Sequence, residues 1–157
     1  MVLGLIETFQ PVTPYDIKQL TQLSVVNFWS LPHTQLYSEC SRLAEAGLLD
    51  ERREETGRRR RVYRLTKAGL KALDDWRSDT EAVLYEIRDL GTLKLFFGAD
   101  PKKLAPGQLE AYEEKLREFE QLHRDVPDMP EGMRLALEAG IGHAKEYVRF
   151  WKRMLEA

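Results

Sequence analysis

The chain has 157 residues, of which 43% are hydrophobic and 32% are charged, a composition typical of one folded domain or two small ones. Its 24 Lys and Arg and 26 Asp and Glu give a net charge of −2, so any nucleic-acid partner must be bound by a local basic patch. One cysteine excludes an internal disulfide, and three scattered histidines exclude a zinc site with ordinary ligand spacing. We expect no metal or other cofactor, no signal peptide, no membrane span and a cytoplasmic location.

Three short helices are predicted in the first third of the chain, where proline residues precede segments with helical spacing of apolar residues. The first covers about residues 1–9. The second begins at Thr13, whose hydroxyl and the carboxylate of Asp16 have the spacing of a capping box. The third covers residues 30–46, and Gly47 follows it as a typical C-terminal stop.

The predicted helix 30–46 has a narrow apolar stripe and a small, polar opposite face. Its N-cap is Ser30, and its stripe consists of Leu36, Cys40 and Leu43. The opposite face carries Thr34, Ser38, Ser41 and Glu45, flanked by Gln35 and Tyr37. Small polar side chains let a helix approach base edges closely inside a DNA major groove. Because Cys40 lies on the stripe, we interpret it as a core residue rather than a redox sensor.

Two short strands are predicted after this helix, over residues 48–53 and 61–66, with Gly57 in the turn-forming segment between them. Residues 51–64 contain seven Arg and three Glu, a local charge of +4 in a chain that is otherwise acidic. Three helices followed by such a hairpin predict a winged helix-turn-helix. We call the hairpin the wing.

Helices are predicted for most of the remaining chain, over about residues 66–78, 81–97, 106–123 and 133–156. Thr66 caps the first of them, while Gly98 and Pro101 end the second. The expected fold is therefore mainly α with a small β-hairpin wing. It has an N-terminal winged helix-turn-helix domain over residues 1–80 and a helical dimerisation domain over residues 81–157.

The last predicted helix carries apolar residues at alternating spacings of four and three, which is typical of a coiled-coil seam. The seam consists of Leu137, Ile141, Ala144, Val148, Trp151 and Leu155. A seam this short is unstable alone, so we expect it to join a helical bundle or a subunit interface. Gly140 and Gly142 are unfavourable inside a helix, and a close helix crossing there would compensate.

The sequence resembles the PadR family of transcriptional regulators in three consecutive stretches. These are FWSLPHTQLY at residues 28–37, LAEAGLL at residues 43–49 and RRRVYRLTKAG at residues 59–69. The pattern of His33, Gln35, Tyr37 and Glu39, the LKLFFG stretch at 93–98 and the stretch from Gly140 to Trp151 are similar to the virulence-activator branch. Thr34 and Pro14 differ from the glycines of many PadR proteins, which leaves the operator sequence open.

The resemblance implies a homodimer, held by the C-terminal helices, that binds an inverted-repeat operator in double-stranded DNA. On this interpretation the helix 30–46 enters a major groove and the wing arginines contact phosphates. The expected DNA-binding residues are His33, Thr34, Gln35, Tyr37, Ser38, Arg42, Arg58, Arg59, Arg60, Arg61 and Tyr63. Whether the protein represses or activates stays open.

Several other residues bear on alternative functions. Phe28, Trp29, Trp76 and Trp151 fit core packing better than a pocket for a small aromatic effector, although some PadR relatives respond to such molecules. His143 and Tyr147 share a helix face without a carboxylate suited to catalysis or metal binding, so they indicate packing. No nucleophile, base and orienting group can be assembled, which argues against an enzyme. The main alternative is a winged-helix module that binds a protein or senses a small molecule without its own operator.

Overall fold

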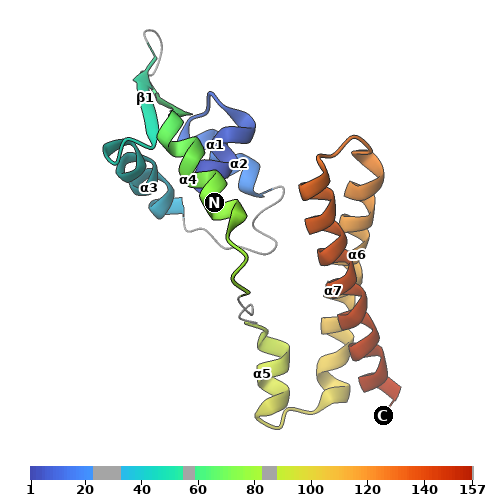
Figure 1. The fold of residues 1–157 in the computed structure, drawn as a ribbon. Coiled ribbons are helices and arrows are strands. Elements are labelled where there is room, and N and C mark those ends of the chain that lie inside the picture. Colours follow the sequence, from blue (N-terminus) through green and yellow to red (C-terminus); the bar gives the residue numbers. More distant parts are fainter. Residues whose placement is uncertain (23–32, 55–58, 83–87, 157) are drawn as a thin grey trace. The chain divides into compact units, whose positions relative to one another are not determined.

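The computed structural model describes residues 1–22, 33–54, 59–82 and 88–156 (Figure 1). The chain divides into two compact units, residues 1–83 and 84–157. None of the helices in the described ranges has the length and apolar character needed to cross a membrane.

The first unit contains four helices and one antiparallel hairpin within its described residues. They are α1 (Val2–Phe9), α2 (Pro14–Gln22), α3 (His33–Glu45), β1 (Leu49–Arg53), β2 (Arg61–Leu65) and α4 (Lys67–Ser78). Each matches a predicted element to within about three residues at its ends. The expected cap Ser30 and the aromatic residues Phe28 and Trp29 lie outside the described residues.

The predicted caps form as the sequence suggests. The Thr13 N–H donates to Asp16 Oδ2 at 2.9 Å, and the Asp16 N–H donates to Thr13 Oγ1 at 3.2 Å. The Gly69 N–H donates to Thr66 Oγ1 at 3.0 Å, which caps α4. Gly47 follows α3 with a φ of 73°, a left-handed conformation that favours glycine.

Helix α1 lies at the centre of the first unit and contacts α3, α4 and β2. The core cluster around it consists of Val2, Leu5, Ile6, Val12, Ile17, Leu36, Cys40, Leu43, Leu49 and Tyr63. The predicted stripe of α3 is thus buried. Burial raises the pKa of the Cys40 thiol to about 11, so the thiol stays protonated at neutral pH. Cys40 is a small core residue, as expected.

The hairpin is joined to the helices by a short stretch of backbone pairing. Tyr63 donates its N–H to the Val12 carbonyl at 2.8 Å, and Val12 returns a bond to the Tyr63 carbonyl at 3.3 Å. The Leu65 N–H donates to Gln10 Oε1 at 2.9 Å. A two-stranded hairpin is marginally stable alone, so these bonds stabilise the wing on the helical core.

The second unit contains α5 (Leu90–Phe96), α6 (Pro101–Asp125) and α7 (Glu131–Glu156). Helices α6 and α7 lie side by side and antiparallel, with α5 against α6 (Figure 1). The prediction for residues 81–97 was too long, because Asp89 accepts the Thr92 N–H at 2.6 Å and caps a helix that begins at Leu90. The prediction for residues 106–123 was too short, because Asp100 caps a helix with Pro101 in its first turn.

The predicted seam on α7 packs largely inside one chain. Ala144 and Trp151 are 2% and 0% exposed, whereas Leu155 is 41% exposed. Salt bridges from Lys145 to Glu120 and from Lys152 to Glu113 tie α7 to α6. Of the two expected roles of the seam, a helical bundle or a subunit interface, the burial of Ala144 and Trp151 within one chain supports the bundle.

Only one of the two seam glycines lies at a close helix crossing. A Cβ added at Gly140 would lie 3.2 Å from the Phe119 ring on α6, whereas one added at Gly142 would meet nothing within 4 Å. The predicted crossing is thus confirmed at Gly140 and wrong at Gly142. Gly91 on α5 allows a close approach to Trp151 on α7, since a Cβ at Gly91 would lie 2.9 Å from the Trp151 ring.

Candidate nucleic-acid interface

The outer face of α3 presents small and polar side chains to solvent. Gln35 and Ser38 are exposed, and Tyr37 is 53% exposed beside them. The Ser38 hydroxyl donates to the Gln35 carbonyl at 3.0 Å, so it bonds to its own helix. The side chains of His33 and Thr34 lie outside the described residues. Gln35, Tyr37 and Ser38 are accessible on one helix, as the proposed contact with DNA requires.

Arg42 extends this face but is paired within its own helix. Its Nε and Nη2 donate to the two carboxylate oxygens of Glu39 at 2.8 and 2.6 Å. These hydrogen bonds lower the pKa of Glu39 below its ordinary value. A contact from Arg42 to a DNA phosphate would use its remaining N–H donors or displace this carboxylate.

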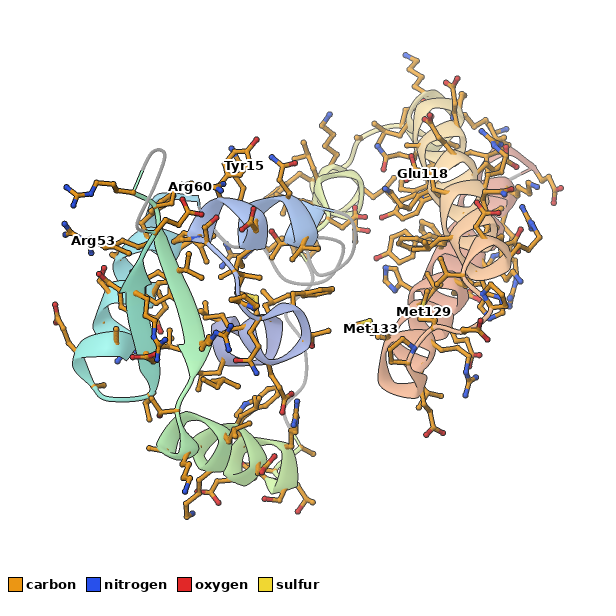
Figure 2. All side chains as sticks on the ribbon, turned by 90° about the horizontal axis from the view of Figure 1, so that it is seen from above. Tyr15, Arg53, Arg60, Glu118, Met129 and Met133 are labelled. Carbon is orange, nitrogen blue, oxygen red and sulfur yellow. The ribbon has the colours of Figure 1, made fainter. Side chains whose placement is uncertain are left out.

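The strand register of the wing places two arginines directly opposite each other. Arg53 on β1 pairs with Arg61 on β2, and Figure 2 shows Arg53 and Arg60 on this hairpin. Like charges on directly opposite residues destabilise a sheet. A hairpin that retains this pair concentrates positive charge at some cost to its stability, which is the pattern of a surface that binds anions.

Arg60 and Arg59 lie where the wing leaves the paired strands. Arg60 is paired with Glu54, whose carboxylate accepts hydrogen bonds from Nε and Nη2 at 3.1 and 3.0 Å. These bonds lower the pKa of Glu54 and raise that of Arg60. Arg59 is exposed and has a φ of 48°, an uncommon conformation for a non-glycine residue. Arg58 lies outside the described residues.

Arg61 connects the wing to α3. Its Nη1 donates to Ser41 Oγ at 3.4 Å, and its Nε lies 3.5 Å from Glu51 Oε1. About half of the Arg61 side chain remains exposed, since its exposed fraction is 49%. The guanidinium therefore stays near the surface while it is held between the wing and the helix.

Tyr63 is a core residue, and its assignment to the DNA-binding surface was wrong. The residue is only 1% exposed, and its hydroxyl donates to Glu51 Oε2 at 2.8 Å. Side chains alternate between the two faces of a strand, so Tyr63 points inward when its neighbours on either side point outward. Burial, with a smaller effect of the hydrogen bond to Glu51, raises its pKa.

Arg53 was missed as a candidate. It is exposed and, by the register, faces Arg61 across the hairpin. The sequence pattern did not identify it, because its position opposite Arg61 depends on the strand register.

The remaining sequence candidates do not form a second site within the described residues. These residues hold no cluster of His, Cys, Asp or Glu suited to a metal ion. Trp76 was expected to pack in the core, but it is 67% exposed, so that prediction was wrong. His143 and Tyr112 each stack on Tyr147 with ring centroids 4.6 Å apart, which agrees with a packing role.

An exposed polar helix next to an arginine-rich hairpin on a small helical core defines a winged helix-turn-helix. Residues 2–75 match the family described as the Transcriptional regulator PadR-like family. The first unit thus carries a PadR-like domain, and the family is one of transcriptional regulators rather than enzymes.

Comparison with characterised proteins supports this assignment. The negative transcriptional regulator PadR of Bacillus subtilis is 25% identical over 98% of this chain and 93% of the relative. Its crystal structure with operator DNA matches with a TM-score of 0.86 over 99% of this chain and 94% of that one, at 24% identity. The same regulator with p-coumaric acid matches with a TM-score of 0.77 over 98% and 90%, at 24% identity. The Vibrio cholerae virulence activator AphA matches with a TM-score of 0.66 over 99% and 94%, at 20% identity.

Proposed function

We propose that the chain is a homodimeric regulator that reads an inverted-repeat operator, with α3 in the major groove and the wing arginines on the adjacent phosphates. The observation that carries the proposal is the link from Arg61 to Ser41, 3.4 Å long, which brings the basic hairpin beside the exposed face of α3. One surface thus combines groups suited to base edges with groups suited to phosphates.

The two parts of this surface have different tasks. Gln35 can form a bidentate hydrogen bond with adenine, and Tyr37 offers an exposed ring and hydroxyl. Arg59, Arg60 and Arg61 supply charge that neutralises phosphates and makes binding depend on salt. The helix therefore provides sequence selectivity, and the wing provides affinity for any duplex.

A homodimer fits both the operator symmetry and the surface of the second unit. A two-fold dimer binds half-sites about one helical turn, or a multiple of it, apart. Helix α5 and the residue after it expose four large apolar side chains, Leu90, Leu93, Phe96 and Phe97, at 64%, 51%, 79% and 77%. Such a concentration of exposed apolar area is typical of an association surface. We assign it to the subunit interface, together with the exposed end of the α7 seam at Leu155.

A small aromatic effector is the second part of the proposal. The B. subtilis regulator was crystallised with p-coumaric acid. In this chain the rings of Tyr112 on α6 and His143 on α7 each stack on Tyr147, with centroids 4.6 Å apart. Isothermal titration with p-coumaric acid tests the idea: binding that weakens the protein–operator complex supports it, and no heat with no effect on the complex contradicts it.

Repression in the cytoplasm is the mode of action that we propose, since the B. subtilis relative is a negative regulator. A reporter gene behind the operator should become more active when the regulator is deleted. Lower activity after deletion would indicate an activator instead.

The decisive experiment is selection of duplexes from a randomised pool, followed by salt titration on the selected duplex and on random DNA. A sequence-selective, salt-sensitive complex of two chains with one palindromic duplex is the expected result. Equal affinity for selected and random DNA would contradict the proposal. It would favour the alternative of a winged-helix module that acts through a protein or a small molecule.

A further inference from the structure

Glu51 lies at the junction of the wing, the core and α3. It stands on β1 directly opposite Tyr63 on β2, and its two carboxylate oxygens have different partners. Oε2 accepts the Tyr63 hydroxyl at 2.8 Å, while Oε1 lies 3.5 Å from Arg61 Nε. Arg61 in turn donates to Ser41 on α3. One carboxylate therefore connects a buried tyrosine to a surface arginine that contacts the candidate recognition helix.

We infer that Glu51 is a positioning residue that fixes the wing relative to α3, so that the arginines and the helix meet one operator together. This inference rests on the proposed DNA-binding function. The Tyr63 end of the connection is immobile, because the ring is buried and the backbone is bonded to Val12 in both directions. Glu51 transmits that rigidity to the guanidinium of Arg61.

Because Glu51 is charged, the inference can be tested by whether its neutralisation strengthens or weakens binding to the operator. A carboxylate close to a DNA-binding surface repels phosphates, so its neutralisation on its own should strengthen binding to every duplex. A carboxylate that positions the wing has the opposite influence on a specific complex, because its loss lets the wing move away from the orientation that the operator needs.

The neighbouring residue Asp50 provides the matched control. It lies on the same strand, carries the same charge and bonds to Arg52 at 3.0 Å, and its side chain is 48% exposed against 26% for Glu51. The side-chain pairs with Tyr63 and Arg61 involve Glu51 and not Asp50. Asp50→Asn thus removes one negative charge and leaves these pairs in place.

The experiment measures fluorescence anisotropy of Glu51→Gln and Asp50→Asn with two labelled probes, a duplex selected from a randomised pool and a random duplex of equal length. Glu51→Gln should weaken binding to the selected duplex by about fivefold or more relative to Asp50→Asn. On random DNA the two variants should bind equally and at least as tightly as the wild type. The isosteric amide still accepts the Tyr63 hydroxyl, and unchanged unfolding temperatures check that both variants fold.

A second variant, Ser41→Ala, interrupts the connection at the helix without changing any charge. It should weaken binding to the selected duplex about threefold, and combining it with Glu51→Gln should add little, because both act through Arg61. If the wild type prefers the selected duplex but Glu51→Gln binds it like Asp50→Asn, the inference is overturned. It is also overturned if the losses of affinity from Ser41→Ala and Glu51→Gln are fully additive. A wild type without preference for the selected duplex would overturn the proposed function as well.

Discussion

Arg60 and Glu54 close the described part of the wing with three hydrogen bonds. Two are side-chain bonds to the carboxylate at 3.1 and 3.0 Å, and the third runs from the Glu54 N–H to the Arg60 carbonyl at 3.0 Å. The guanidinium is thus oriented before DNA arrives, but the carboxylate that orients it occupies Nε and Nη2, which form one of the edges through which a phosphate could be bound. Glu54 and phosphate compete for the same group.

The first prediction concerns this competition. Glu54→Gln should strengthen binding to any duplex about twofold to fivefold at low salt, since an exposed ion pair of this kind contributes little energy. The gain should shrink as salt increases, because salt screens the charge that was removed. Fluorescence anisotropy at several salt concentrations measures the effect, with Glu110→Gln on α6 as a charge-matched control. Weaker binding by Glu54→Gln would mean that orientation of Arg60 matters more than competition.

The second prediction separates affinity from selectivity. Replacing Arg59 and Arg60 by Ala should weaken binding to selected and random duplexes alike and flatten the slope of log K against log salt by up to about two units. An unchanged slope would exclude these arginines from phosphate contact. Gln35→Ala is the comparison variant: it should lower the preference for the selected duplex and leave the slope unchanged.

The positions of the wing and of α3 were predictable because local patterns determine them. The stripe of Leu36, Cys40 and Leu43 has helical spacing, and the arginines surround a turn-forming glycine. Tyr63 was misassigned because a basic flanking sequence suggested exposure, whereas its position in the strand alternation decides its burial. Its partner Glu51 could not be identified from the sequence, since the pairing depends on register.

The second unit was harder to predict, and particular residues show why. A continuous helix over residues 81–97 ignored Asp89, which can cap a helix through the N–H of Thr92. Asp100 and Pro101 together form a standard helix start, but the proline was interpreted only as a break. The seam of α7 gave the correct buried face at Trp151, yet periodicity cannot tell whether another helix of the same chain or a second chain covers that face.

The third prediction tests the assignment of α5 to the subunit interface. Phe96 is 79% exposed, so Phe96→Glu should leave the fold of one chain intact while it places a charge in the apolar contact. We expect the dimer to dissociate at least about tenfold more readily, as measured by light scattering over a dilution series. Lys94→Glu on the same helix is the control for a change of charge alone. An unchanged dimer in the Phe96 variant would place the interface elsewhere.

The fourth prediction concerns the contact between α4 and the segment that precedes β1. A Cβ added at Gly69 would lie 2.1 Å from the Leu48 carbonyl oxygen, a distance that backbone atoms cannot accept without a shift. Gly69→Ala should therefore lower the free energy of unfolding by about 1 to 3 kcal/mol. A Cβ added at Gly107 in α6 would meet nothing within 4 Å, so Gly107→Ala should raise the free energy of unfolding by up to about 1 kcal/mol. Urea unfolding measures both, and equal effects would contradict this account.

The fifth prediction is a pH dependence that originates at Asp89. Burial acts to raise the pKa of this carboxyl, but hydrogen bonds from the Thr92 N–H and the Tyr112 hydroxyl outweigh it, so the pKa is lowered in the folded chain. The resulting stabilisation is present above the ordinary Asp pKa of about 3.9 and is lost as pH falls through the lowered value.

Asp89→Asn should therefore be less stable than the wild type at pH 7 and should approach it in stability as the pH falls through the lowered pKa. Thermal unfolding across this range checks the expectation. Asp125→Asn, at the exposed end of α6, provides the comparison. A stability difference that stayed constant with pH would show that the Asp89 hydrogen bonds matter through geometry rather than charge.

The burial of Cys40 has a practical consequence for such experiments. It is the single cysteine of the chain, it is 0% exposed, and its thiol stays protonated at neutral pH. A thiol reagent can therefore modify the native protein only when the first unit opens, so the rate of labelling measures how often that opening occurs. A cysteine introduced on the surface would react long before Cys40 does, so a fluorophore or spin label can be attached at one chosen position without first removing the natural cysteine.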